Sequence, residues 1–191
     1  MKNLLLVLFT LSTFAAFASN TNPITEGKTI NTETSTVVWT GKKVTGSHTG
    51  TINIKSGNLD FEKGHLTGGE VVMDMTSLVC TDLKGGGAQK LVGHLSSDDF
   101  FGVPNHPTAT FKITEVKPTT SNTTMITGDL TIKGQTHPVT FTATMGENNA
   151  TATMTIDRTK YGIKYGSGSF FDNLGDKTIY DTFDLELNLN Y

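Results

Sequence analysis

The chain has 191 residues, of which 36% are hydrophobic and 17% are charged, and its formal net charge is -3. This length favours a single domain, and the small net charge with apolar residues spread along the chain argues against disorder. Mild acidity argues against nucleic-acid binding, which needs a basic face. The single Cys excludes an intramolecular disulfide and a Cys-rich zinc site.

Residues 1–18 have the pattern of a secretory signal peptide. A short basic start is followed by a mainly apolar run that ends with small residues, Ala16 and Ala18, on either side of Phe17. This pattern is typical of a cleavage site, and the run is shorter than the roughly 20 apolar residues that span a membrane. We therefore expect cleavage near Ala18 and a periplasmic or secreted protein.

Residues 19–29 are polar, contain Pro23 and show no periodicity, so they are predicted to be a loose leader before a domain at 30–191. From there to the end, apolar and polar residues alternate with a period of two, which indicates strands. Thr occupies many of the polar positions, where its β-branch favours extended backbone and its hydroxyl meets water. The alternation is seen in residues 52–54, 71–75, 111–113, 126–132, 139–145, 151–157 and 183–191.

Strands with one apolar and one wet face favour an antiparallel sheet, because strands of parallel sheets are usually buried on both faces. About eight strands fit the chain, and a sheet of that size can either fold into a sandwich or close into a barrel. An eight-stranded barrel is just wide enough to hold one small ligand. The alternation alone does not choose between these two architectures.

The stretch 88–101 departs from the alternation. Leu91, Val92 and Leu95 lie near helical spacing, three glycines precede the stretch, and Pro104 follows it. We predict one short helix and a loop here, and we interpret the glycines as a flexible start rather than a phosphate loop, because the surrounding P-loop pattern is absent.

Three segments carry a resemblance to a known family. They read HLSSDDFF at 94–101 with NHPTATF at 105–111, GDLTIKGQTHPV at 128–139, and IDRTKYGI at 156–163. Their order and spacing resemble the YceI-like family of exported, lipocalin-like proteins, often called polyisoprenoid-binding. The resemblance covers about 30–191, and it implies an all-β fold, an extended antiparallel eight-stranded β-barrel with one short helix. It also implies an apolar tunnel that holds a long isoprenoid chain, with no enzymatic step established.

The ligand on this interpretation is an isoprenoid or another long-chain amphiphilic lipid, carried or stored by an exported protein. Apolar and flexible side chains suit such a lining because burial of each CH₂ contributes about 0.8 kcal/mol. The predicted ligand-binding residues are Trp39, Ile52, Val71, Met73, Met75, Leu95, Phe100, Phe101, Phe111, Leu130, Ile132, Phe141, Met154, Ile156, Arg158, Phe183 and Leu185.

Structural roles compete with ligand binding for several of these residues. The apolar set can form an ordinary core, and Phe100 or Phe101 can anchor the helix segment instead of gating the tunnel. Arg158 can bind a headgroup, since its planar fork suits phosphate, but a salt bridge that pins its strand to a loop is favoured. Cys80 is either a buried small hydrophobe or a reactive thiol that dimerises the protein.

Two other function classes stay open. The barrel can be an interaction module for a membrane redox or stress-response protein, and transient membrane contact and dimer formation are both compatible with the sequence. Alternatively, His94, Asp98, Asp99 and His106 can bind a metal or act in hydrolysis, because imidazole and carboxylate suit divalent metals. A local hydrogen bond is favoured for these four residues. No catalytic signature occurs in the chain, so no catalytic residue, metal or cofactor is predicted.

Overall fold

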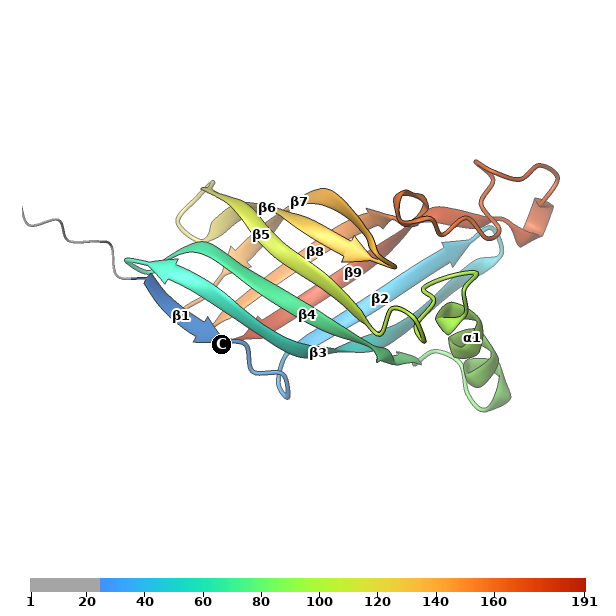
Figure 1. Ribbon diagram of the computed structural model, residues 1–191, viewed down its shortest axis with the longest axis horizontal. Helices are drawn as coiled ribbons and strands as arrows, with labels where there is room; N and C mark the ends of the chain where they lie inside the picture. The colour runs from blue at the N-terminus through green and yellow to red at the C-terminus, as the bar shows by residue number, and fades with distance from the viewer. Residues whose placement is uncertain (1–24) are drawn as a thin grey trace, which may run out of the picture.

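The computed structural model describes residues 25–191, so the predicted signal peptide and residues 19–24 lie outside the described residues (Figure 1). The described chain forms nine strands, one α-helix and two short 3-10 helices. The elements are β1 (Thr25–Thr29), β2 (Thr36–Lys43), β3 (Gly46–Glu62), β4 (His65–Cys80), α1 (Gly86–Ser96), β5 (Thr108–Pro118), β6 (Thr123–Ile132), β7 (Gln135–Met145), β8 (Asn149–Asp157), η1 (Arg158–Tyr161), η2 (Gly175–Lys177) and β9 (Ile179–Asn190).

Eight of these strands close into an antiparallel barrel, which confirms the predicted fold class. The strands follow the order β3-β2-β9-β8-β7-β6-β5-β4, and a further pairing of β3 with β4 closes the ring. Neighbours in the chain are mostly hairpin partners, as expected for antiparallel strands joined by short turns. Figure 1 shows an elongated barrel with α1 and the long β8–β9 connection at one end and β1 at the other.

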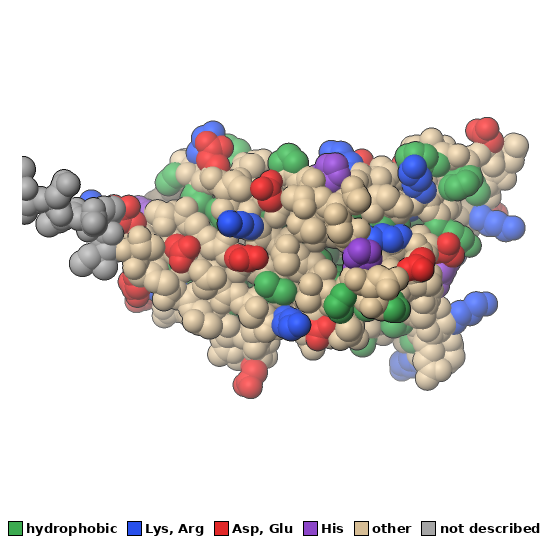
Figure 2. Space-filling view, in the orientation of Figure 1, with side chains coloured by type: hydrophobic (Ala, Val, Ile, Leu, Met, Phe, Trp, Pro, Cys, Tyr) green, Lys and Arg blue, Asp and Glu red, His purple; other side chains and the backbone are tan. Residues whose placement is uncertain are grey.

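The two-residue alternation places apolar side chains inside the barrel and threonines outside. On β6, Ile126, Leu130 and Ile132 are buried, whereas Thr127, Asp129 and Thr131 between them are partly or fully exposed. Outer threonines pair across strands: the Oγ1 atoms of Thr127 and Thr140 lie 2.8 Å apart. Such cross-strand pairs are a recurrent source of sheet stability. Most of the outer face is therefore uncharged, with scattered acidic and basic side chains (Figure 2).

Tight turns fix the register of two long hairpins. Lys63 and Gly64 between β3 and β4 have φ angles of 51° and 80°, and Lys133 and Gly134 between β6 and β7 have φ angles of 50° and 73°. Two successive positive φ angles are the signature of a type I′ turn, whose twist matches that of the flanking strands. These turns fix which residues of β3 and β4, and of β6 and β7, lie opposite each other.

Residues 25–29, expected to belong to a loose leader, instead form the edge strand β1. Thr25 pairs with Glu62 and Lys28 with Leu59, so β1 extends the sheet beside the far end of β3. All its residues except Lys28 are exposed. The strand is held mainly by backbone pairing to one neighbour, so it lacks the apolar alternation by which seven of the other strands, β3 to β9, were predicted.

Helix α1 starts two residues before the stretch 88–101, for which a short helix and a loop were predicted, and it ends within that stretch at Ser96. The chain turns there because Ser97 donates its Oγ hydrogen to the carbonyl of His94 at 2.8 Å, and the N–H groups of Phe100 and Val103 bond to Ser97 and Ser96. These bonds fold the chain after α1 back toward the barrel. Within residues 25–191, no helix has the length and apolar character required to cross a membrane.

Candidate ligand-binding cavity

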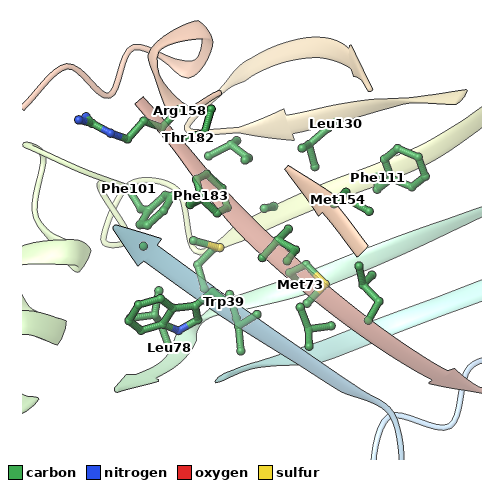
Figure 3. A pocket seen from close by; sticks show the side chains of 18 of the residues that line it. Trp39, Met73, Leu78, Phe101, Phe111, Leu130, Met154, Arg158, Thr182 and Phe183 are labelled. Atoms are coloured by element: carbon green, nitrogen blue, oxygen red, sulfur yellow. The ribbon is translucent and has the colours of Figure 1, made fainter. Parts of the chain in front are cut away.

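The barrel encloses a cavity of about 490 Å³ whose lining is contributed by every barrel strand and by α1. Figure 3 shows Met73, Phe111, Leu130, Met154 and Phe183 pointing into the same space from different strands. All the residues predicted to contact a ligand lie on the wall of this cavity, with the exception of Ile156. Ile156 is only 2% exposed and belongs to the hydrophobic core without lining the cavity.

Several inward-facing side chains are only partly buried although they point into the barrel. On β9, Phe183, Leu185 and Leu187 are of intermediate exposure and line the cavity. Side chains that met across the barrel axis would be fully buried, because close-packed interiors leave few voids larger than a water molecule. The partial exposure of these residues therefore reflects unfilled space inside the barrel.

The cavity is closed at the β1 end. The rings of Phe61 and Tyr191 lie 5.4 Å apart there, and the Nζ atom of Lys28 lies 5.1 Å and 5.2 Å from their centres. Phe61 is buried, and Leu66 and Leu189 form the adjacent part of the lining. An apolar tail that enters the barrel would thus end against this cluster.

The exposed polar members of the lining gather mainly at the opposite end, beside α1. They include Lys42, Lys43, Lys177 and Tyr180. Lys42 Nζ donates to Asp184 Oδ2 at 2.7 Å. This bond, together with one from Thr155, lowers the pKa of Asp184 below its usual value. The cavity therefore reaches the surface at an end rimmed by lysine and tyrosine side chains.

Trp39 on β2 lines the cavity near this opening (Figure 3). It is 9% exposed, and its Nε1 donates to the carbonyl oxygen of Val79 at 3.1 Å. The ring packs directly over the backbone of Gly50: a Cβ added there would lie 2.6 Å from the ring and 1.8 Å from Val79 O. Glycine at position 50 thus makes room for the only tryptophan in the chain.

Arg158 is part of the wall, but its guanidinium group is engaged with the backbone. Nε donates to Tyr180 O at 2.9 Å, and the two terminal nitrogens donate to Ile163 O at 2.8 Å and Ile179 O at 3.1 Å. In Figure 3 the guanidinium points away from the apolar side chains of the cavity. Burial lowers the pKa of Arg158, and the charge of Asp181, 3.7 Å away, opposes this shift. These contacts pin the chain directly after β8 to the connection before β9 and to the first two residues of β9.

Phe100 and Phe101 both pack inward. The ring of Phe100 is 6% exposed and lies 4.9 Å from the ring of His94 and 5.6 Å from that of Tyr165. Phe101 meets the edge of Phe183 at 6.2 Å. Both phenylalanines therefore attach the segment after α1 to the barrel, and a gating role remains a prediction.

The polar residues considered for a metal site are dispersed. His94 Nε2 lies 3.6 Å from Asp99 Oδ2 rather than beside Asp98, whose backbone carbonyl accepts from Lys133. The His94 ring packs edge-on against Tyr165, at 4.5 Å between ring centres. In the part of the chain that the structure describes, no three His, Cys, Asp or Glu side chains converge on one point.

Cys80 is half-buried, and its thiol donates to Asp82 Oδ1 at 3.1 Å. Burial raises the pKa of Cys80, and the hydrogen bond to Asp82 adds to this effect. Asp82 also lies 2.9 Å from His48 Nδ1, and the bonds from Cys80 and His48 lower the pKa of Asp82. A raised pKa disfavours the thiolate, which is the reactive form of cysteine.

Leu78 is a lining residue that the sequence analysis missed. Val71, Met73 and Met75 alternate toward the cavity, and continued alternation would bring residue 77 inward. The pairing of β3 with β4 shifts at this point, between the partners of Thr51 and Asn53. The extra residues of this bulge turn Leu78 to the inside, as bulges re-aim side chains.

The chain thus forms a closed eight-stranded antiparallel barrel with an apolar interior, the architecture of lipocalin-like barrels. Residues 29–191 match the model of the YceI-like domain. The chain therefore belongs to the YceI-like family, as its sequence segments predicted.

Among curated proteins, the chain is similar to the UPF0312 protein of Pseudomonas putida, with 42% identity over 81 residues, and to that of Ectopseudomonas mendocina, with 52% identity over 50 residues. These matches cover 37% and 26% of this chain, and they span 42% and 26% of the two relatives.

Solved structures show the same fold at low sequence identity. Burkholderia cenocepacia BcnA matches with a TM-score of 0.66 and 21% identity, over 84% of this chain and 98% of BcnA. A polyisoprenoid-binding domain from Saccharophagus degradans matches with a TM-score of 0.58 and 13% identity, over 88% and 97% of the two chains.

Proposed function

We propose that this protein binds an isoprenoid or a similar amphiphilic lipid inside its barrel and acts as an exported carrier or reservoir. The observation that carries the proposal is the apolar cavity of about 490 Å³, whose exposed polar lining residues lie mainly beside α1. The packed rings of Phe61 and Tyr191 lie at its β1 end. Ligand pockets typically have volumes of about 300–1,000 Å³. Family membership and the polyisoprenoid-binding domain among the structural neighbours support the lipid class.

The geometry suits a tail-first mode of binding. The interior offers almost only carbon and sulfur atoms, whereas the polar members of the lining lie mainly at the open end. Each fully buried isoprene unit of five carbons contributes at most about 4 kcal/mol, at about 0.8 kcal/mol per carbon group. Affinity can therefore grow with tail length without specific polar contacts. The headgroup would remain near the lysine and tyrosine rim, and no catalytic step enters the proposal.

Fluorescence of Trp39 provides a direct binding assay, because it is the only tryptophan and lies on the cavity wall. The protein is titrated with geraniol, farnesol and geranylgeraniol, presented from detergent micelles. We expect affinity to rise with each isoprene unit until the cavity is filled and then to level off. Lipid extraction and mass spectrometry of protein purified from its exported form identify the native ligand. Lipid binding would be refuted if mass spectrometry finds only ligand-free protein and Trp39 fluorescence does not respond to any of the three prenyl alcohols.

A matched pair of variants on β8 separates binding in the cavity from binding on the outside. Ala152 lines the cavity and is only half-buried, whereas the next residue, Thr153, is exposed on the outer face. Ala152→Phe places a ring in the cavity and is expected to weaken binding of the longest prenyl alcohol at least tenfold. Thr153→Phe places the same ring outside and is expected to bind normally. Equal loss of binding in both variants would contradict a site inside the barrel.

The main alternative is a non-enzymatic interaction module whose interior is a plain core. A cavity volume well below about 300 Å³ would favour that alternative, because it is too small for a typical ligand. The cavity of about 490 Å³ exceeds this threshold and favours a container.

A further inference from the structure

Exposed aromatic side chains cluster at the open end of the barrel. Tyr165, Phe170, Phe171 and Tyr180 are 46%, 46%, 51% and 48% exposed. The first three come from the connection between η1 and β9, and Tyr180 is the second residue of β9. The adjacent turn between β2 and β3 adds Val44, which is 52% exposed and donates its backbone N–H to Thr178 at 3.1 Å. Large apolar side chains exposed together mark sites of interaction with proteins or membranes. We call these five residues the mouth surface.

Lysines surround the mouth surface. The segments 41–48, 83–99 and 160–178, which form this end of the molecule in Figure 1, contain seven lysines and four aspartates. Two further basic and three further acidic side chains bond to these segments, so this end carries nine basic and seven acidic groups, a formal charge of +2; they are Lys133, Arg158, Asp82, Asp181 and Asp184. The whole chain has a charge of -3, so the remainder is acidic. Figure 2 shows green hydrophobic and blue basic side chains interspersed at the right-hand end. The open end is thus complementary in charge to an anionic surface.

The mouth surface is continuous with the cavity. Tyr165 and Tyr180 belong both to the mouth surface and to the cavity lining. The exposed Lys43 and Lys177 also line the cavity at this end. Lys164 Nζ lies 4.6 Å above the Phe170 ring, so a positive charge sits directly beside an exposed aromatic side chain. Aromatic rings with neighbouring lysines are typical of protein surfaces that lie in the headgroup region of a bilayer.

We propose that the mouth surface docks on an anionic lipid bilayer. Phe170 and Phe171 insert between the headgroups, and the surrounding lysines bind the lipid phosphates. In this orientation the opening of the cavity faces the bilayer, and a lipid tail passes between membrane and barrel without crossing water. The inference extends the proposed lipid-binding function, but docking itself can be measured independently of ligand uptake.

Flotation with vesicles tests the docking. The purified protein is mixed at low salt with vesicles of phosphatidylcholine alone or of phosphatidylcholine with phosphatidylglycerol. We expect binding to the anionic vesicles and a steep decrease as salt is raised, because salt screens charges beyond about 10 Å at 0.1 M. If the protein does not bind anionic vesicles better than neutral ones, the proposal is overturned. The mouth surface would then be assigned to contact with a protein partner.

Three variants locate the contact. Phe170→Ser with Phe171→Ser removes two exposed rings and is expected to weaken vesicle binding at least tenfold. Lys164→Gln with Lys177→Gln is expected to weaken it about 25-fold, or about fivefold per lysine, the equivalent of about 1 kcal/mol each. The matched control lies at the opposite end, where Lys117→Gln with Met125→Ser also removes a charge and an exposed apolar side chain. An equal loss in this control would refute a specific mouth surface.

Different results would refute membrane docking and lipid binding inside the barrel. The Phe170 and Phe171 side chains do not line the cavity, so the variant that replaces both should take up farnesol from detergent micelles as the unchanged protein does. Normal uptake with weak vesicle binding supports docking through the mouth surface. Vesicle binding without any prenyl uptake in the unchanged protein would refute the lipid-container function and leave the docking surface in place.

Discussion

Replacement of Arg158 by Met distinguishes a structural arginine from one that binds a headgroup. The side chain is 5% exposed and donates hydrogen bonds to three backbone carbonyls, and its charge faces Asp181 at 3.7 Å. Met retains an unbranched apolar stem but lacks the guanidinium group, so it leaves the three acceptors and the carboxylate without their cation. Removal of one partner from a buried ion pair costs about 3–5 kcal/mol. We therefore expect the free energy of unfolding of Arg158→Met to fall by about that amount.

Urea unfolding followed by Trp39 fluorescence measures this loss. Arg158→Lys keeps the charge but not the planar fork and should lose about half as much stability, which gives a usable value if the Met variant does not fold. Lys160→Met, at an exposed position of the same 3-10 helix, should change stability by less than about 0.5 kcal/mol. The reasoning is refuted if Arg158→Met unfolds like the unchanged protein while its affinity for phosphorylated prenyl ligands collapses.

Three further outcomes follow from local geometry. Gly50→Ala should lower the free energy of unfolding by about 1–3 kcal/mol, typical of overpacking, and red-shift the emission of Trp39; an unchanged spectrum would contradict the packing. The pKa values of Asp82 and Asp184 are lowered in the folded protein, so their contribution to stability is complete above the unfolded pKa of about 3.9. This stabilising contribution is lost as pH falls through the lower pKa values of the folded protein. Asp184→Asn should therefore lower the free energy of unfolding at neutral pH but change it little in strong acid. Urea unfolding midpoints measured across this pH range test the expectation. The raised pKa of Cys80 should make iodoacetamide react more slowly in the folded protein than in urea, and equal rates would exclude thiol protection.

Much of the fold follows from local patterns. A period of two located seven of the eight barrel strands, all except β2, because each strand has one wet face, as the outer pair of Thr127 and Thr140 shows. The same rule missed β1, whose pairing with β3 leaves no periodic signal. Alternation also did not distinguish a β-sandwich from a β-barrel, because closure of the barrel depends on the pairing of β3 with β4. The ordered family segments decided that question.

Strand alternation also separates the residues of the candidate site that could be predicted from those that could not. Residues such as Met73 and Leu185 were predictable because parity within a strand fixes the side that each side chain faces. Leu78 was not, since a bulge interrupts the parity of β4. Tyr165 was missed as well, because it comes from the connection between η1 and β9, where no period exists. The three acceptors of Arg158 lie 5 to 22 residues away in sequence and belong to that connection and the start of β9, so only the folded chain reveals them.

Small residues explain why the interior is hollow. The inside of an eight-stranded barrel is just wide enough to be filled by side chains, so a cavity requires that some inward positions carry little volume. Ala109, Ala143, Ala150 and Ala152 all line the cavity, although alanine is depleted in strands. Larger apolar residues at these sites would bury more surface and contribute about 0.8 kcal/mol for each added CH₂ that finds room. The barrel thus keeps unfilled volume at the expense of stability, a trade-off frequent at functional sites. If Ala152→Phe both stabilises the protein and weakens prenyl binding, the alanines serve the cavity. If it destabilises the protein, they serve close packing instead.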